Sequence, residues 1–155
     1  MTAIGLRTKS RQFAMQMLFQ WEMSPQDTRK LEIKFWKGAT ASENTEKFAN
    51  QLFEGAVRTV KDLDPVIEQY CDNWRFDRLS AIDRAILRLA FHELSIKKTP
   101  AKVIINEAIG LAKKFSGDDA GSFVNGVLDA ASKAQTQKKT ASADSHAADA
   151  KRHKS

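Results

Sequence analysis

The chain has 155 residues, about the length of one domain, and 42% of them are hydrophobic, so it is long enough to bury a core. Its formal charge is +6, but residues 12–135 carry 17 basic and 17 acidic side chains, so the basic excess lies in residues 1–11 and 136–155. This distribution excludes a protein with a uniformly basic surface, such as a histone-like protein. The chain has one cysteine, no apolar run near the roughly 18 residues that span a bilayer, and no apolar signal sequence, so we expect a cytoplasmic protein without a membrane anchor, a disulfide framework or a CxxC metal site.

Apolar residues recur at helical spacing along most of the chain, and no segment shows the strict alternation of a half-buried strand. The expected elements, in chain order, are a helix ended by Ser24-Pro25, a second helix around residues 31–36, a loop over 37–44, a third helix over 45–62, a fourth beginning at Asp64-Pro65, a fifth over 79–95, a sixth after Thr99-Pro100 that ends at Ser116-Gly117, and a seventh beginning at Asp118-Asp119. We therefore predict an all-α fold of about seven helices.

Local signals support several of these boundaries. Proline restricts the residue before it and cannot continue a helix, which is why Ser24-Pro25 is expected to end one. Ser80, three residues before Asp83, resembles a capping box. Beyond about residue 136 the sequence lacks large apolar side chains, so we divide the chain into a folded domain, 1–135, and a disordered basic low-complexity tail, 136–155.

Residues that could support catalysis are few. His92 is expected to be a half-buried packing residue, because the sequence places neither a second base nor a nucleophile beside it. Cys71 is expected to be a small buried hydrophobe. The acids Asp118 and Asp119 are expected at a helix N-terminus, where they favour the positive end of the helix dipole. The chain also lacks the phosphate-binding and metalloprotease motifs. We therefore expect a protein that is not an enzyme and needs no cofactor or metal.

Side chains suited to nucleic acid gather on the first helix. Lys9, Gln12, Gln16 and Phe19 share one face, with Arg7 and Arg11 close by. Cations that pair with phosphate, amides that bond base edges and a ring that stacks on a base are the groups used in single-stranded RNA recognition. The pattern alone leaves a second interpretation open, a solvated helix start with Phe19 in the core. The same choice between core packing and ligand contact applies to Phe123.

Three stretches resemble one bacterial family. RQFAMQMLFQW at 11–21 matches the pattern R-x-x-A-x-x-x-L-[YF]-x-W that opens the NusB family of transcription antitermination factors. DRAILRLAFHEL at 83–94 is similar to the family's central helix. The run PAKVIINEAIGLAKKFSGDDAGSFVNGVLD at 100–129 resembles its most distinctive stretch, INEA-x-x-LAK-x-[FY] followed by FVNGVLD. The resemblance covers about residues 7–132 and leaves the tail outside.

The resemblance implies a fold of two three-helix bundles packed roughly at right angles. It also implies a function. Members of the family bind boxA, a short single-stranded element of ribosomal RNA leader transcripts, together with NusE, a protein of the small ribosomal subunit. The complex acts on RNA polymerase and suppresses premature termination, including Rho-dependent termination. No catalysis is implied.

The resemblance also assigns residues. The RNA-contacting surface would include the basic residues Arg7, Lys9 and Arg11, then Phe19, and then the segment from Asp119 through Ser122 to Phe123. Relatives often have Tyr in place of Phe19, and some have Lys in place of Ser122. The expected NusE-facing residues lie on the central helix and are Asp83, Arg84 and Arg88. Asn125 and Gly126 of the FVNGVLD stretch are expected to be structural.

Two further hypotheses remain open from the sequence. One is a homodimeric helical interaction module in which self-association masks the RNA surface. The other is a stand-alone relative of the NusB-like domain of ribosomal RNA cytosine methyltransferases. Such enzymes need a long α/β catalytic domain after the helical one, and only about 20 residues follow it here.

Overall fold

Six α-helices and one short 3₁₀ turn, η1, make up the part of the chain that the structure describes, and no β-strand occurs there. The computed structural model describes the backbone of residues 3–72 and 74–152 and the side chains of residues 5–72 and 74–136. The elements are α1 (Ala3–Met23), α2 (Thr28–Lys37), α3 (Glu43–Gln69), η1 (Phe76–Arg78), α4 (Ala81–Ile96), α5 (Ala101–Ser116) and α6 (Asp118–Arg152). The predicted all-α class is confirmed.

Most helix boundaries follow the sequence signals. α1 ends at Met23, directly before Ser24-Pro25. The Ser80 side chain caps α4 by accepting a hydrogen bond from the backbone N–H of Asp83, as the capping pattern predicts. None of the described helices has both the length and the apolar character needed to cross a membrane.

The helix that we predicted to begin at Asp64-Pro65 does not exist as a separate element. α3 continues through Pro65 to Gln69. The Asp64 carboxylate, which we expected to cap a new helix, instead accepts two hydrogen bonds from the Arg88 guanidinium of α4, at 2.9 and 2.8 Å. This tertiary contact anchors α3 to α4 beside a proline that on its own would favour a break in the helix.

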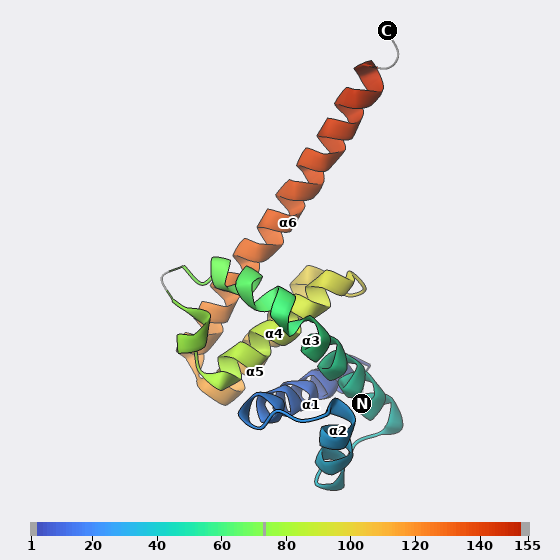
Figure 1. Cartoon of the computed structure of the whole chain (residues 1–155), viewed down its shortest axis with the longest axis vertical. Coiled ribbons are helices and arrows are strands. Elements are labelled where there is room, and N and C mark those ends of the chain that lie inside the picture. Colours follow the sequence, from blue (N-terminus) through green and yellow to red (C-terminus); the bar gives the residue numbers. More distant parts are fainter. Residues whose placement is uncertain (1–2, 73, 153–155) are drawn as a thin grey trace.

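The predicted pair of three-helix bundles is present. In the first, α1 packs along α3 and contacts α2, and the Trp36 indole N–H donates to Asn50 Oδ1 at 2.8 Å to join α2 to α3. In the second, α5 packs between α4 and α6. The central helix α4 also contacts α1 and α3, so it joins the two bundles (Figure 1). Fully buried apolar side chains from both bundles, such as Leu18, Phe53 and Leu87, form one continuous core.

One glycine sets the distance between α3 and α4. A Cβ atom at Gly55 would lie 2.1 Å from Nε2 of His92, so any side chain there would displace the imidazole ring. Because the ring packs directly on the α3 backbone, His92 is buried, more deeply than the half-buried position we predicted. Cys71 is buried too, and its thiol donates to the carbonyl of Ile67 within α3.

The last helix extends well past the bundles. The backbone of α6 is helical from Asp118 to Arg152 and projects away from the rest of the molecule (Figure 1). Its side chains pack on the core through Val124, Leu128 and Ala131. Composition predicts disorder beyond 136, but the same residues are rich in alanine and lysine, which have high helix propensity. The division of the chain at residue 135 therefore stays a prediction.

Candidate nucleic-acid interface

The first turns of α1 separate the predicted cations into two groups. Arg7 and Lys9 are exposed. Arg11 is only 5% exposed, and its guanidinium donates to both carboxylate oxygens of Glu93 on α4, at 2.6 and 2.9 Å, and to Glu107 on α5 at 3.3 Å. The prediction that Arg11 contacts phosphate is therefore corrected, because this side chain joins α1 to the second bundle.

Burial and pairing act on Arg11 in opposite directions. Burial alone would lower the pKa of its guanidinium, but the hydrogen bond and charge of Glu93, with the charge of Glu107, raise that pKa above its ordinary value. Thr8 donates its hydroxyl to the same Glu107 carboxylate at 2.6 Å. The result is a charged cluster that fixes the start of α1 and keeps Arg11 ionised inside the fold.

The middle of α1 faces the end of α5. Gln12 is half-buried and accepts a hydrogen bond from Lys114 Nζ at 2.9 Å. One and two turns further on, the half-buried side chains of Gln16 and Phe19 line a hollow of about 760 Å³ together with Phe115. Phe19 therefore packs against the core and also borders the hollow, and its predicted contact with RNA stays a prediction.

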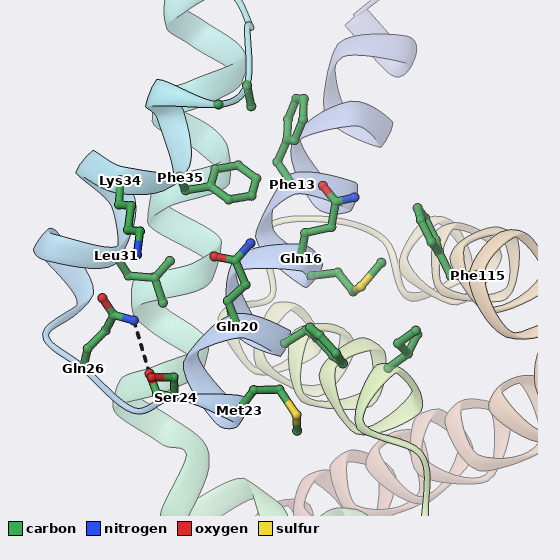
Figure 2. A pocket seen from close by; sticks show the side chains of 15 residues that line it. Phe13, Gln16, Gln20, Met23, Ser24, Gln26, Leu31, Lys34, Phe35 and Phe115 are labelled. Atoms are coloured by element: carbon green, nitrogen blue, oxygen red, sulfur yellow. Dashed lines mark hydrogen bonds between the residues drawn. The ribbon is translucent and has the colours of Figure 1, made fainter.

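The hollow combines rings, amides and one cation. Most of its lining comes from α1, α2 and the loops on either side of α2, and Ile82 of α4 and Phe115 of α5 complete it (Figure 2). The amides of Gln16 and Gln20 and the ammonium group of Lys34 belong to the same lining as the rings of Phe13 and Phe35 (Figure 2). The hollow therefore combines apolar walls with amide donors and acceptors, the groups that bind an unpaired nucleotide base.

The start of α6 carries the remaining predicted RNA residues. Gly117 has a φ of +105°, a region that favours glycine, and this turn lets α6 begin immediately after α5. Asp119 and Ser122 are exposed on the first turns of α6, whereas Phe123 is half-buried and packs against the core. Phe123 does not line the hollow that Phe19 borders, so the aromatic residue that extends this surface toward α5 is Phe115.

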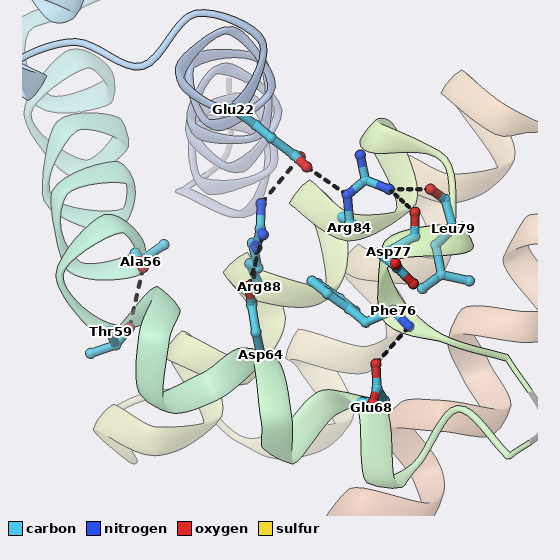
Figure 3. A network of polar contacts seen from close by, with 10 residues as sticks. All are labelled: Glu22, Ala56, Thr59, Asp64, Glu68, Phe76, Asp77, Leu79, Arg84 and Arg88. Atoms are coloured by element: carbon cyan, nitrogen blue, oxygen red, sulfur yellow. Dashed lines mark hydrogen bonds and ion pairs between the residues drawn. The ribbon is translucent and has the colours of Figure 1, made fainter.

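The residues predicted to contact NusE are mostly engaged within the fold. Arg88 is 7% exposed and binds Asp64 of α3 and Glu22 of α1, the latter at 3.1 Å (Figure 3). Arg84 Nε donates to the other oxygen of Glu22 at 2.7 Å and also bonds the Leu79 carbonyl. The prediction of direct partner contacts is corrected for Arg88, whose guanidinium joins α1, α3 and α4.

Arg84 is largely committed to the same network, and Asp83 is half-buried beside the Ser80 cap. For these two residues the assignment to a partner surface stays a prediction.

Asn125 and Gly126 also differ from expectation. Both are exposed, and a Cβ atom at Gly126 would meet nothing within 4 Å, so no close helix approach requires this glycine. Gly121 is the position where a helix approach is tight, because a Cβ atom there would lie 2.7 Å from Cγ of Lys113. The exposed Asn-Gly pair therefore belongs to the surface of α6 rather than to its packing.

The sequence alone did not single out Lys114 and Phe115 as interface residues. Their adjacency, a cation followed by a ring at the end of α5, was the available signal, and Lys114 Nζ lies 5.5 Å from the Phe115 ring centroid. Lys34 of α2 was missed because the hollow it lines is built jointly with residues of α1. No group of His, Cys, Asp or Glu that could hold a metal occurs among the described side chains.

Fold and surface together define a class, all-α proteins with a cationic and aromatic face suited to nucleic acid. Comparison with known sequences then identifies the family. Residues 8–133 match the NusB family. The chain is 41% identical over 127 residues to the transcription antitermination protein NusB of Koribacter versatilis (strain Ellin345), covering 81% of this chain and 87% of the relative. It is 40% identical over 131 residues to the protein of that name from Myxococcus xanthus (strain DK1622), covering 81% and 94%. The chain belongs to the NusB family.

Solved structures agree with this assignment. T. maritima NusB matches with a TM-score of 0.72 at 33% identity, over 82% of this chain and 90% of that one. A structure described as antitermination factors NusB and NusE in complex with dsRNA matches with a TM-score of 0.74 at 30% identity, over 83% and 97%. A chain with this fold has therefore been observed together with RNA and NusE.

Proposed function

We propose that this protein is an RNA-binding transcription antitermination factor. It binds the boxA element of ribosomal RNA leader transcripts together with NusE, and the complex suppresses premature termination by RNA polymerase, including Rho-dependent termination. The observation that carries the proposal is the surface where Gln16, Phe19 and Phe115 border one hollow on a chain of the NusB family. These partners belong to the cytoplasm, and the role needs neither a cofactor nor catalysis.

The proposed contacts follow from side-chain chemistry. The exposed cations Arg7 and Lys9 attract the phosphates of the strand, which gives a salt-dependent, sequence-independent contribution. Lys114 adds a third charge beside Gln12. Stacking on Phe19 then holds an unpaired base at the edge of the hollow, and nearby amides bond its polar edge. Single-stranded RNA fits this arrangement because its bases are free to enter a hollow that a duplex cannot.

The start of α6 is proposed to supply selectivity. Asp119 is exposed and acidic, so it repels phosphate but accepts hydrogen bonds from base amino groups, as carboxylates do from cytosine. Ser122 and Phe123 lie one turn further along the same helix. The ring of Phe123 is half-buried, which leaves an edge for contact with RNA while the rest packs on the core.

The stacking role can be tested with Phe19→Ala. Loss of one base stack costs about 1–3 kcal/mol, which weakens binding of a boxA oligonucleotide roughly 5- to 150-fold. Fluorescence anisotropy measures the affinity. Phe19→Tyr keeps the ring and should bind like the wild type, and Trp74→Ala removes an exposed ring from the loop before η1 as a matched control.

Unchanged boxA affinity in folded Phe19→Ala would rule out stacking on this residue. Light scattering of the free protein and of the RNA complex tests the dimer hypothesis in the same samples. A dimer that RNA dissociates would support masking of the RNA surface, and a monomer throughout would exclude it.

A further inference from the structure

A second polar groove crosses the molecule on the α3 side of α1. It consists of two neighbouring hollows of about 410 and 360 Å³. The first is bordered by Arg7 of α1 and Lys47 of α3, and the second by Arg58 of α3 and Lys98, which follows α4. Both hollows are lined by Phe48 and Gln51 of α3, so they lie side by side, and we call the pair the α3 groove.

The α3 groove is strongly positive. Arg7, Lys47, Arg58 and Lys98 are all exposed, and none of them pairs with a carboxylate among the described side chains. The lining includes one acid, Glu93, and both of its oxygens are bound by Arg11. Four free cations along one groove, with the only acid neutralised, match a chain of phosphates.

The first hollow is held in place by local contacts. Arg7 stacks its guanidinium on the Phe48 ring, with Cζ 3.7 Å from the ring centroid. Ser10 donates its hydroxyl to the Thr45 carbonyl at 2.9 Å, which joins α1 to α3 beneath the groove. Because stacking restricts the guanidinium before any ligand arrives, less side-chain entropy is lost when it binds a phosphate.

His92 adds a buried imidazole to the lining of the second hollow. His92 lies there against Gly55, and its Nδ1 has no hydrogen-bond partner among the described residues. Burial, and then the charge of nearby Arg58, lower the pKa of His92, so the ring is neutral at pH 7. Arg58 and Lys98 therefore provide the charge of this hollow.

We propose that the α3 groove is a second part of the RNA track, which binds the phosphates of nucleotides flanking the boxA element. This inference rests on the proposed function. Arg7 connects the two surfaces, because it belongs to the candidate boxA interface on α1 and also borders the groove. A single strand leaving the boxA surface past Arg7 meets Lys47, then Arg58 and Lys98, with Gln51 between the two hollows.

The test compares RNAs of two lengths. A boxA core oligonucleotide and the same core extended by a short uridine tract at its 5′ or 3′ end are titrated over a range of salt concentrations. Wild-type protein should bind one of the extended RNAs more tightly than the core, with a steeper salt dependence. Each phosphate contact adds about 0.7 to the slope of log affinity against log salt for a single strand.

The variant Arg58→Ala/Lys98→Ala should lose the additional affinity that the wild type has for the extended RNA over the core. Its salt slope for the extended RNA should fall by about 1.4, because two phosphate contacts are removed, while its affinity for the core stays at the wild-type level. Lys30→Ala/Lys133→Ala is the matched control, since it removes two exposed cations from α2 and α6 and lowers the net charge equally. Circular dichroism confirms that both variants are folded.

The outcomes separate the two proposals. If the wild type binds the core but gains nothing from either extension, the groove inference is wrong and the proposed function stands. If the control loses as much as Arg58→Ala/Lys98→Ala, the gain reflects net charge, and the groove is again refuted. A variant that binds extended RNA normally but loses affinity for NusE would assign the groove to the protein partner instead. No binding of the core by the wild type overturns both proposals.

Discussion

The buried ion pair between Arg11 and Glu93 allows the contributions of charge to the fold and to RNA binding to be separated by mutation. The two residues are 5% and 4% exposed, and their bidentate contact lies among Leu89, Ile104 and Leu111. Arg11→Met removes the cation and leaves the Glu93 carboxylate buried without its main partner. Breaking a buried pair from one side costs about 3–5 kcal/mol, a large share of the roughly 5–15 kcal/mol that stabilises a domain.

The double variant Arg11→Met/Glu93→Leu should recover most of that loss, because both replacements suit the apolar surroundings and no carboxylate is left at position 93. Glu107, the second partner of Arg11, keeps its hydrogen bond from the Thr8 hydroxyl. Urea denaturation of the wild type, the single variant and the double variant measures the free energies of unfolding. Anisotropy with boxA RNA is then measured on the double variant, which should bind like the wild type. If Arg11→Met leaves stability unchanged, or if the stable double variant loses RNA affinity, Arg11 acts as an RNA contact and the structural assignment is wrong.

Three further predictions concern packing, pH and the C-terminal segment. Gly55→Ala should destabilise the fold by about 1–3 kcal/mol through its clash with His92, and an unchanged or raised melting temperature would contradict the packing. In the double variant Gly55→Ala/His92→Ala, thermal unfolding should show a smaller loss of stability than the sum of the losses in the two single variants. Glu32 is 2% exposed, and burial, followed by the adjacent Glu54 carboxyl, raises its pKa from 4.5 to about 8, so the folded protein holds this proton to a higher pH than the unfolded chain and loses stability between about pH 4.5 and 8. Glu32→Gln should reduce that loss of stability, measured by urea denaturation at pH 5 and pH 8, and an equal pH dependence in both proteins would contradict this prediction. Deleting residues 136–155 should lower the affinity for boxA and scrambled RNA by the same factor, since five basic and two acidic side chains are removed, and a selective loss for boxA would show that the segment reads sequence.

Local signals predicted the elements well because each depends on a few neighbouring residues. The Ser80 cap and the end of α1 at Ser24-Pro25 were of this kind. Pro65 was misread because local propensity did not decide the outcome there: α3 continues through it, and the neighbouring Asp64 binds Arg88, 24 residues further along the chain. The sequence pattern around Pro65 does not reveal that Arg88 of α4 binds Asp64 beside it.

The same limit explains the errors in the candidate site. Arg11 and Lys9 look equivalent in sequence, yet only Arg11 faces Glu93, which lies 82 residues further along the chain. Helical spacing placed Gln16 and Phe19 on one face of α1, and both line the hollow, whereas the contributions of Lys114 and Phe115 depend on how α5 packs against α1. Residues on one helix can be grouped from the sequence, but residues brought together by two bundles cannot.

The central claim, recognition of boxA together with NusE, is tested most directly by one titration. Labelled boxA RNA and a scrambled RNA of equal length and composition are titrated with the protein, in the absence and presence of NusE. The proposed function predicts tighter binding of boxA than of the scrambled strand, with a further increase when NusE is present. Equal affinities for the two RNAs under both conditions would contradict it and leave only charge-driven, sequence-independent binding.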